Sequence, residues 1–563
     1  MKERKYSKGY EAIKFFETIN NSTDLSLRKE TLVSSLYYLY YCKLNGNKYV
    51  DLKNVSVKDD RITFAESYLY QIEDVLKELF EKYSIEDLKF FAESLLLEWD
   101  NLASIKSGDI PTPISISELA LKILDVREGE KIADFGSGIG RFLFNLYQSQ
   151  ENSDLTGIEL NFSRYIMAQM LNEIITNKKI KFVNADVFYL SDNEEQYDKI
   201  FSNYPFSLRT TSSPESQKVI LESLGSDTKV AFLDWVFNLL IVKKLKQNGI
   251  GVAITTSGSL FNLADKDVRK FFIENGYINT IIKLPVKMFA GTSIGTNLLI
   301  LSHNNETVRM IDASDICEAG RRFNTFSEEN IKDILSLCNA NAENSKVITR
   351  SEISSNDYNL STDVYLTEDE ELDNDIELET VLLNIRRAAQ ISASALDELL
   401  SDEKTNYGCI MMADVQDNTI SNNIKSLSEI PDKFKKFIVK DGDIIISKAP
   451  TPNFKAAVYK SEDNRECVAN GNMYIISPNT NKIDPYYILA FFNSPLGKKR
   501  LNSIATGTVV RSLPVDGLKK IKIPYVGIDE QSQKANLLRK KVIEVCNLKT
   551  RLEELSIEME EVF

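Results

Sequence analysis

The segment Ile132–Gly140 constrains the fold of this chain more than any other feature, because it leads from a short apolar run into a glycine-rich turn. A helical stretch, residues 141–149, follows at once. Glycines allow positive φ and let a ligand approach the backbone closely. A helix N-terminus adds free N–H groups and a positive dipole end. This order of strand, glycine turn and helix predicts a ligand-binding unit of an α/β fold.

The sequence around this turn, from residue 118 to about 302, alternates short β-branched runs with helical stretches. Such alternation is typical of an α/β domain with a mostly parallel sheet. Residues 303–366 look like an appendage to that domain. Residues 1–105 instead repeat apolar positions at three- and four-residue spacing and contain no proline, which predicts a helical N-terminal domain. We therefore expect a Rossmann-like core over residues 106–366 behind that helical domain.

The C-terminal third changes character three times. Eight carboxylates between Glu368 and Glu379 predict a solvated linker. The stretch 376–400 predicts a helix. Residues 367–402 would therefore form a linker with a spacer helix. Residues 403–525 are rich in strand and turn signals and predict an α+β domain. The last segment, 526–563, predicts a long helix with a coiled-coil seam, or a helix that packs within the chain. The seam residues are Leu538, Val542, Val545, Leu548, Leu552, Leu555 and Met559.

Composition excludes several classes of protein. The chain has 563 residues, 43 % hydrophobic and 27 % charged, as in soluble proteins of several domains. No run of about 18 apolar residues suggests a membrane span, and the N-terminus lacks the apolar core of a signal peptide. Six scattered cysteines without a CxxC pair predict neither a metal site nor disulfides, so we expect a cytoplasmic protein. The one histidine, His303, follows an apolar run and predicts a structural role rather than a hydrolase.

The net charge of −14 argues at first sight against a nucleic-acid partner. The charge is uneven, however, because residues 403–525 carry 18 basic and 12 acidic side chains. This net charge of +6 predicts a DNA-binding domain in which phosphate contacts position the protein and polar side chains read bases. The candidate contacts are Lys433, Lys435, Lys436, Lys448, Lys498, Lys499, Arg500 and Arg511.

Three carboxylates indicate which ligand the glycine turn binds, since a GxGxG turn alone also suits a dinucleotide. Asp134 precedes the glycines, where it can accept from an ammonium group. Glu159 ends the next strand and can accept both ribose hydroxyls, and Asp186 ends a third, where it can bond an exocyclic adenine amine. This set suits S-adenosylmethionine, which has no pyrophosphate. The expected cofactor residues here are Asp134, Phe135, Gly136, Ser137, Gly138, Gly140, Glu159 and Asp186.

After a fourth strand comes Ser202-Asn203-Tyr204-Pro205-Phe206, which resembles the (D/N/S)-P-P-(Y/F/W) motif of amino-methyltransferases. An exocyclic amine is a poor nucleophile because its lone pair is delocalised into the ring. The Asn203 side-chain oxygen and the next backbone carbonyl can accept its hydrogens, which orients the lone pair and stabilises developing charge. Phe206 can stack on a base that has left the duplex. The expected catalytic residues are Asn203, Tyr204, Pro205 and Phe206, with Tyr204 in place of the usual proline.

Residues 1–366 resemble the modification (M) subunits of type I restriction–modification systems, which are gamma-type DNA adenine-N6 methyltransferases. Gly108–Pro113 is similar to an element of that family that helps to hold the methionine end of the cofactor, which implies that Thr112 and Pro113 contact it. Further matches in order along the chain are Gly249–Ile254, Thr256–Phe261, Ile282–Pro285, Phe289, Gly295–Leu301, Ile311–Ser314 and Asn356–Ser361.

Residues 376–563 resemble half of a type I specificity (S) subunit with one target-recognition domain. The matches are Gly442–Ser447, Tyr487–Ser494, Leu518–Pro524 and Asp529–Gln533, the last of which resembles the start of that family's spacer helix. The family reads a bipartite site with two recognition domains. The resemblance therefore implies a homodimer formed through the C-terminal spacer helices.

Together these features predict a site-specific adenine-N6 DNA methyltransferase that uses S-adenosylmethionine and selects its target in double-stranded DNA through a fused recognition domain. The chain has no PD-(D/E)xK constellation and no GxxxxGK[ST] loop, so cleavage would need a separate restriction subunit with nuclease and ATPase activity. Two alternatives remain open. Tyr204 motivates a DNA-recognition or assembly module with a degenerate methyltransferase fold, and the reacting motif is shared with RNA and protein amino-methyltransferases.

Overall fold

The structure is a computed structural model in which two compact units, residues 1–366 and 367–563, are described separately. The described residues are 2–24, 28–55, 59–99, 110–192, 194–206, 208–212, 214–225, 228, 230–289, 292, 294–366, 372–421, 423–450, 454–461, 465–505 and 512–560.

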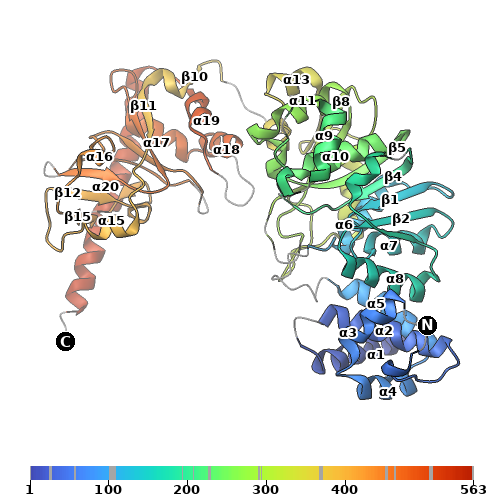
Figure 1. The fold of residues 1–563 in the computed structure, drawn as a ribbon. Helices are drawn as coiled ribbons and strands as arrows, with labels where there is room; N and C mark the ends of the chain where they lie inside the picture. The colour runs from blue at the N-terminus through green and yellow to red at the C-terminus, as the bar shows by residue number, and fades with distance from the viewer. Residues whose placement is uncertain are drawn as a thin grey trace. The chain divides into compact units, whose positions relative to one another are not determined.

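The first unit begins with helices, as the apolar spacing predicts (Figure 1). Aromatic rings form their core, where Phe15, Tyr83 and Phe91 lie in mutual contact. The side chain of Ser84 caps the last of these helices in a reciprocal capping box with Asp87, which fixes where that helix begins. The helices are α1 (Lys2–Asn21), α2 (Arg28–Leu44), α3 (Asp60–Leu69), α4 (Glu73–Lys82) and α5 (Ile85–Glu98).

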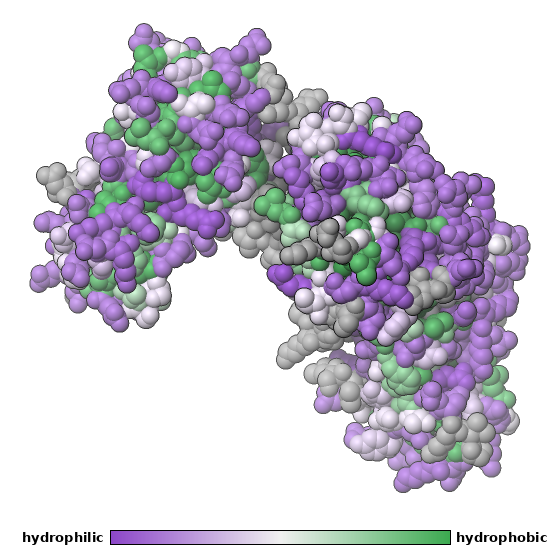
Figure 2. All heavy atoms as spheres, turned by 45° about the horizontal axis from the view of Figure 1, so that its top comes forward, coloured by the Kyte–Doolittle hydropathy of each residue, from purple (hydrophilic) through white to green (hydrophobic). Residues whose placement is uncertain are grey.

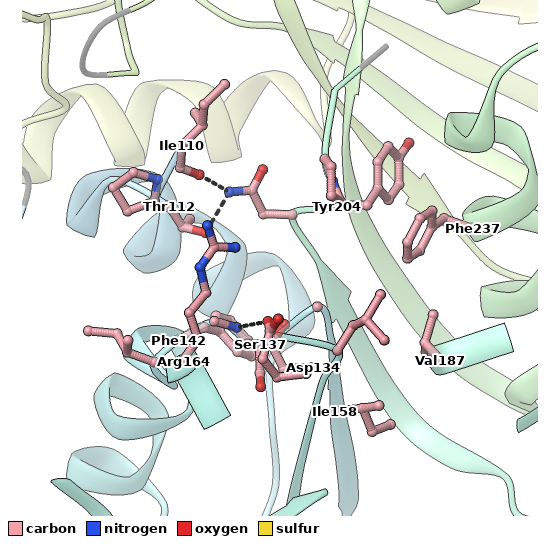
Figure 3. Close-up of a pocket in the computed structure, with 18 of the residues that line it drawn as sticks. Ile110, Thr112, Asp134, Ser137, Phe142, Ile158, Arg164, Val187, Tyr204 and Phe237 are labelled. Atoms are coloured by element: carbon pink, nitrogen blue, oxygen red, sulfur yellow. Dashed lines mark hydrogen bonds between the residues drawn. The ribbon is translucent and has the colours of Figure 1, made fainter. Parts of the chain in front are cut away.

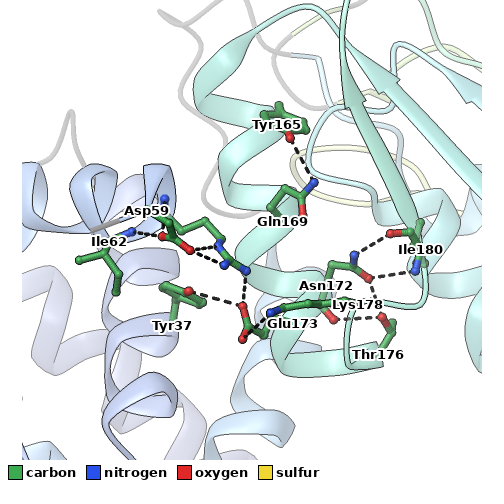
Figure 4. Close-up of polar contacts among 11 residues, drawn as sticks. Tyr37, Asp59, Ile62, Tyr165, Gln169, Asn172, Glu173, Thr176, Lys178 and Ile180 are labelled. Carbon is green, nitrogen blue, oxygen red and sulfur yellow. Dashed lines mark hydrogen bonds and ion pairs between the residues drawn. The ribbon is translucent and has the colours of Figure 1, made fainter. Parts of the chain in front are cut away.

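A partly buried carboxylate joins this helical domain to the following α/β domain (Figure 4). Glu173 lies on α8 (Phe162–Thr176) and accepts a hydrogen bond from Tyr37 of α2 at 3.4 Å. The guanidinium of Arg61, on α3, also binds Glu173, and Lys178 pairs with its second oxygen at 3.1 Å. Since the Tyr37 ring is buried, these contacts hold α2 and α3 firmly against α8.

The α/β domain is built on a nine-stranded sheet with the strand order β3-β2-β1-β4-β5-β7-β6-β8-β9. Strands β1 to β5 run parallel, and β7 inserts antiparallel between β5 and β6. The appendage expected after residue 302 is part of this sheet, because β8 pairs with β6 and β9 with β8. The strands are β1 (Lys131–Phe135), β2 (Asp154–Glu159), β3 (Lys181–Asn184), β4 (Tyr197–Ser202), β5 (Leu245–Thr256), β6 (Ile278–Lys283), β7 (Thr296–Leu301), β8 (Thr307–Asp312) and β9 (Ser345–Thr349).

Helices cover both faces of this sheet, so successive strand residues enter different cores. Ile132 packs into the core that contains α6, α7 and α8, whereas Ala133 packs into the core of α10 and α11. The ring of Phe142 on α7 stacks on Phe201 of β4 at 4.1 Å, which seats α7 on the sheet. The remaining helices are α6 (Ile114–Leu124), α7 (Arg141–Ser149), α9 (Pro214–Leu224), α10 (Leu233–Lys244), α11 (Lys266–Glu274), α12 (Glu328–Leu337), α13 (Arg350–Ser355) and α14 (Thr362–Leu366).

The second unit combines small sheets with helices. The larger sheets have the orders β11-β19-β16-β17 and β15-β12-β18, and β10 pairs with β20. The strands are β10 (Asp375–Glu377), β11 (Leu382–Arg387), β12 (Tyr407–Ile410), β13 (Val415–Gln416), β14 (Thr419–Ile420), β15 (Lys425–Leu427), β16 (Ile444–Ser447), β17 (Ala456–Val458), β18 (Glu466–Ala469), β19 (Met473–Pro478) and β20 (Lys522–Pro524). The helices are α15 (Ala393–Asp397), α16 (Asp432–Lys435), α17 (Pro485–Asn493), α18 (Pro495–Ile504), α19 (Val515–Lys520) and α20 (Ile528–Glu560).

The helix predicted over 376–400 is wrong. This stretch holds the strands β10 and β11, a short 3-10 helix (Leu378–Val381) and only one α-helix, α15. Leu378, Leu382 and Ile385 have helical spacing, but they pack into the core of the second unit from β11 and the turn before it. Because β11 pairs with β19, about ninety residues later in the chain, a local pattern could not reveal it. The same pairing carries the recognition-domain sheet across the boundary expected at residue 402.

The long C-terminal helix lies where the sequence predicts it, as α20. Its first turns pack on the second unit, since Gln531 and Ala535 are fully buried and Arg539 pairs with Asp484 at 2.9 Å. Further along, Ile543 and Leu548 are 48 % and 65 % exposed. The helix therefore packs within the chain at its start and presents apolar side chains to solvent later.

No helix among the described residues is long and apolar enough to cross a membrane. Hydrophilic residues cover most of the face drawn in Figure 2, and hydrophobic residues gather there only in small patches.

Candidate active site

The candidate site lies at the carboxyl ends of four neighbouring parallel strands. Asp134 lies near the end of β1, Glu159 ends β2, Asp186 follows β3 and Asn203 follows β4. These strands are adjacent in the order β3-β2-β1-β4, so the four side chains meet at one edge of the sheet. Ligands of open α/β sheets bind at this edge.

The glycine turn has the backbone that its sequence demands. Gly136, Gly138 and Gly140 have φ values of 81°, 56° and 87°, in the region that favours glycine. A Cβ at Gly140 would also lie 2.5 Å from the ring of Phe182, so a larger residue would have to displace that ring as well as adopt a strained backbone. The turn is tied to β2, because the N–H groups of Gly136 and Ser137 both donate to the Ile158 carbonyl at 2.9 Å.

The three carboxylates differ in their environment. Asp134 is 3 % exposed, and burial together with the neighbouring charge of Glu159 raises the pKa of Asp134 well above its usual value. Glu159 accepts hydrogen bonds from the backbone of Gly138 at 2.8 Å and of Asn161 at 2.7 Å. Partial burial also raises the pKa of Asp186, although the backbone N–H of Phe188 donates to its carboxylate at 3.0 Å. An uncompensated buried carboxylate such as Asp134 favours a cationic ligand.

The amide of Asn203 is bound on one side only, by Ile110 and Thr112, which are labelled in Figure 3. Its nitrogen donates to the carbonyl of Ile110 at 3.2 Å and to the hydroxyl of Thr112 at 2.9 Å. Its oxygen Oδ1 is buried and has no hydrogen-bond partner among the described residues. A buried acceptor without a partner is costly, so this atom is a candidate to bind a donor from a ligand.

The ring of Tyr204 occupies the core, although the residue also borders the cavity. It stacks on Phe237 at 4.8 Å, and its hydroxyl contacts the amide oxygen of Asn238 at 3.4 Å (Figure 3). Burial, reinforced by the nearby charge of Asp234, raises its pKa well above 10. The ring therefore anchors the segment that carries Asn203, at the position where the related motif has a proline.

Pro205 and Phe206 form the rim of the site. Pro205 is exposed, and Phe206 is half-buried with its edge-to-face contact on Phe289 at 5.4 Å. One face of an aromatic side chain beside an exposed proline is available to an incoming planar group.

A cavity of about 620 Å³ connects these features, within the range of small-ligand sites. Pro113, Phe135 and Gly140 do not line it: Pro113 precedes α6, Phe135 is buried in the core, and Gly140 precedes α7. The sequence-predicted residues that do line it are Thr112, Asp134, Gly136, Ser137, Gly138, Glu159, Asp186, Asn203, Tyr204, Pro205 and Phe206.

The sequence reasoning missed seven polar or aromatic lining residues, which are Trp99, Arg141, Phe142, Arg164, Phe188, Glu215 and Phe237. Trp99, at the end of α5, brings the helical domain to the cavity, and no local signal marked it. Arg141 is the first residue of α7, so its place directly after the glycine turn could have indicated it. Arg164 lies near the start of α8. His303 is not among the lining residues and contacts the ring of Tyr277, and no cluster of metal ligands occurs in the described part of the chain.

The structure corrects one of the predicted DNA contacts. Arg500 forms a two-pronged ion pair with Asp375 at 3.0 and 2.6 Å, and both side chains are only 4 % exposed. Arg500 therefore has a structural role, which its position beside two other basic residues concealed. Arg511 lies outside the described residues. Five of the other predicted contacts are exposed and Lys448 is half-buried; the exposed ones are Lys433, Lys435, Lys436, Lys498 and Lys499.

Residues 88–374, half of the chain, match the family described as N-6 DNA methylase. The chain belongs to the N-6 DNA methylase family. Residues 395–556 also match the type I restriction modification DNA specificity domain. The resemblance inferred from the motifs is therefore confirmed for both parts of the chain.

Two relatives and one solved structure illustrate the match. The chain is 25 % identical to the type I restriction enzyme MpnII methylase subunit of Mycoplasma pneumoniae, over 58 % of this chain and 63 % of that protein. It is 27 % identical to the MjaVII methylase subunit of Methanocaldococcus jannaschii, over 52 % and 55 %. It thus spans between half and two thirds of the length of these relatives. The type I methyltransferase subunit of Streptococcus thermophilus, 20 % identical, aligns with a TM-score of 0.51 over 63 % of this chain and 98 % of that one, which confirms the expected fold class.

Proposed function

We propose that the protein is a site-specific DNA methyltransferase that methylates the N6 amine of adenine. The observation that carries this proposal is the buried, unpaired amide oxygen of Asn203, a residue that lines the cavity at the carboxyl edge of the sheet. The membership of the N-6 DNA methylase family supports it. Since DNA is the proposed substrate, we expect the protein to act in the cytoplasm.

The residues of the cavity fit S-adenosylmethionine as the cofactor. This group would supply an activated methyl on a sulfonium. Asp134 is buried beside Glu159 and would bind the ammonium group at the amino-acid end of the cofactor. The positive charge of that ammonium would compensate the buried carboxylate. Glu159 has lone pairs left for ribose hydroxyls, and Asp186 stands at the end of the next strand for the adenine amine. The positive-φ glycines leave room for the ligand at the backbone, since a Cβ at Gly136 or Gly138 would meet no atom within 4 Å.

Asn203 would bind and orient the amine of the target base. Its Oδ1 accepts one amine hydrogen, and the carbonyl of Tyr204 accepts the other. This geometry draws electron density toward the nitrogen and stabilises the positive charge that develops on it. No general base is needed, because the proton leaves after the nitrogen has become cationic. Phe206 would hold the flipped base by stacking, in a pocket whose entry the exposed Pro205 borders.

The buried ring of Tyr204 would stabilise the core of an active enzyme and of a degenerate fold alike. The unpaired amide oxygen of Asn203 favours the active enzyme, because an unsatisfied buried acceptor is costly unless a ligand uses it. The fused specificity-like domain likewise favours DNA over RNA or protein as the substrate.

The second unit would select the DNA sequence. Its exposed Lys433 lies over the ring of Phe434 on α16, and Lys436 lies over Phe437 just after that helix. Lys498 and Lys499 are exposed on α18. Such side chains suit contacts to phosphates. A homodimer through α20 would supply a second recognition unit, and the exposed Ile543 and Leu548 are available for that contact. A separate restriction subunit would carry out any DNA cleavage.

Incubation of the purified protein with methyl-labelled S-adenosylmethionine and varied DNA duplexes tests the proposal. We expect label in the N6 position of adenine at one bipartite sequence, and no transfer by an Asn203→Ala variant that still binds the cofactor. Equal labelling by the wild type and by Asn203→Ala would refute the proposed role of the site. Unmodified duplexes together with labelled RNA or protein would refute DNA as the substrate.

A further inference from the structure

The amide of Asn203 can have only one orientation in this structure. Its two ends look alike in shape, but the carbonyl of Ile110 can only accept a hydrogen bond. The amide nitrogen must therefore face Ile110 and Thr112, at 3.2 and 2.9 Å, and the buried, unpaired oxygen must point away from them. The residues around residue 110 thus decide which end of the amide a ligand meets.

The segment that holds the amide is itself held. Arg141 donates from Nη1 to the carbonyl of Thr112 at 2.8 Å and is only 5 % exposed. Arg141 begins α7, directly after Gly140, so the segment 110–112 links the glycine turn to Asn203. Ile110, Thr112 and Arg141 all line the same cavity.

We propose that Thr112 is a positioning residue whose hydroxyl holds the Asn203 amide with its oxygen toward the substrate amine. The inference rests on the proposed function and names a role beyond contact with the cofactor, which the sequence alone suggests for Thr112. Without the hydroxyl, Asn203 keeps only the longer bond to Ile110, and its side chain can rotate. A rotated amide would present N–H groups to the substrate amine, where they cannot accept its hydrogens.

The kinetic test compares Thr112→Val, which removes the hydroxyl at nearly constant shape, with Thr112→Ser, which keeps it. We expect Thr112→Val to lower the single-turnover methylation rate about tenfold, the effect of one lost hydrogen bond to a buried amide. The dissociation constant of S-adenosylmethionine, measured by calorimetry, should change less than about threefold, and Thr112→Ser should restore the rate. The matched control is Thr296→Val, which removes a buried hydroxyl on β7 that has no partner among the described residues. A weaker cofactor affinity with an unchanged rate would overturn the proposal and make Thr112 a cofactor ligand only.

A second measurement does not depend on activity. In protein labelled with ¹⁵N-asparagine, the side-chain amide signal of Asn203 is identified by its absence in Asn203→Asp. We expect its hydrogens to exchange slowly in the wild type and at least about tenfold faster in Thr112→Val. If wild-type protein methylates no nucleic acid but shows this difference, the proposed function fails and the positioning role stands. Equal exchange in both proteins overturns the positioning role whatever the activity.

Discussion

Replacing Arg500 by alanine should destabilise the second unit strongly. The guanidinium forms two hydrogen bonds with the carboxylate of Asp375 and a third, at 2.8 Å, with the carbonyl of Lys522. It thereby clamps together β10 and β20, on which those two partners lie. Removal of one partner leaves a buried carboxylate without its counter-charge, which costs about 3–5 kcal/mol. That is a large part of the about 5–15 kcal/mol that stabilises a typical domain.

The assay should be specific to the second unit. Both tryptophans, Trp99 and Trp235, lie in the first unit, so their fluorescence does not report on this change. Hydrogen exchange of peptides from β10 and β20, measured in increasing urea, reports on it directly. Lys499→Ala is the matched control, because that neighbouring cation is exposed and should leave the exchange unchanged.

The pH dependence adds a second check. Burial raises the pKa of Asp375, but hydrogen bonds from Arg500 and from the backbone of Leu372 outweigh it, so the pKa lies below 3.8. A lowered folded-state pKa gives a stabilisation that is complete above the unfolded value of about 3.9 and is lost as the pH falls through the folded value. The difference between wild type and Arg500→Ala should therefore be full at pH 7 and should shrink below pH 4. Equal protection of the two proteins at pH 7 would refute the structural role of Arg500.

Three further predictions concern the first unit and the DNA contacts. Asp134→Asn should weaken S-adenosylmethionine binding at least tenfold yet raise the melting temperature of the ligand-free protein, because the raised pKa of Asp134 means that its carboxylate opposes folding at neutral pH. For the same reason, the cofactor affinity of the wild type, measured by calorimetry, should begin to fall at a higher pH than an ordinary carboxyl group would cause as the pH is lowered. An affinity that does not change with pH would contradict this. The affinity for duplex DNA, measured by fluorescence anisotropy, should fall with salt concentration. Lys498→Ala and Lys499→Ala should each make the negative slope of log affinity against log salt less steep by about one, whereas Lys332→Ala in the acidic first unit should leave the slope unchanged. Tyr204→Ala should lower the free energy of unfolding by about 3–5 kcal/mol, measured by urea unfolding with tryptophan fluorescence. Tyr204→Phe keeps the contact with Phe237 and should lower it by about 1 kcal/mol or less. Similar losses for both variants would assign the anchoring to the hydroxyl.

Much of the site could be predicted from the sequence because its signals are local. A strand end followed by glycines places Asp134 and the turn, and the neighbouring strand ends place Glu159 and Asp186. The parallel order of the strands then makes residues that are distant in sequence meet at one edge. The segment Ser202–Phe206 was likewise recognisable from residue types alone.

Contacts between distant segments could not be predicted in this way. Alternation along a strand can indicate that Ile132 and Ala133 point to opposite faces of the sheet. No local pattern reveals that β11 pairs with β19 or that Arg500 binds Asp375, 125 positions away. From the sequence, Tyr204 is only a departure from the proline of the related motif. The structure shows that its ring stacks on Phe237 in the core.

The sequence by itself determined which chemical groups the site contains: the acids at the strand ends, the positive-φ glycines and the amide of Asn203. These follow from residue identity and from order along the chain, which need only local geometry. The tertiary structure alone decided how the groups are oriented, since the Asn203 amide takes its direction from Ile110 and Thr112, more than ninety residues earlier. A side-chain amide has two nearly identical ends, and only partners brought together by folding can distinguish them.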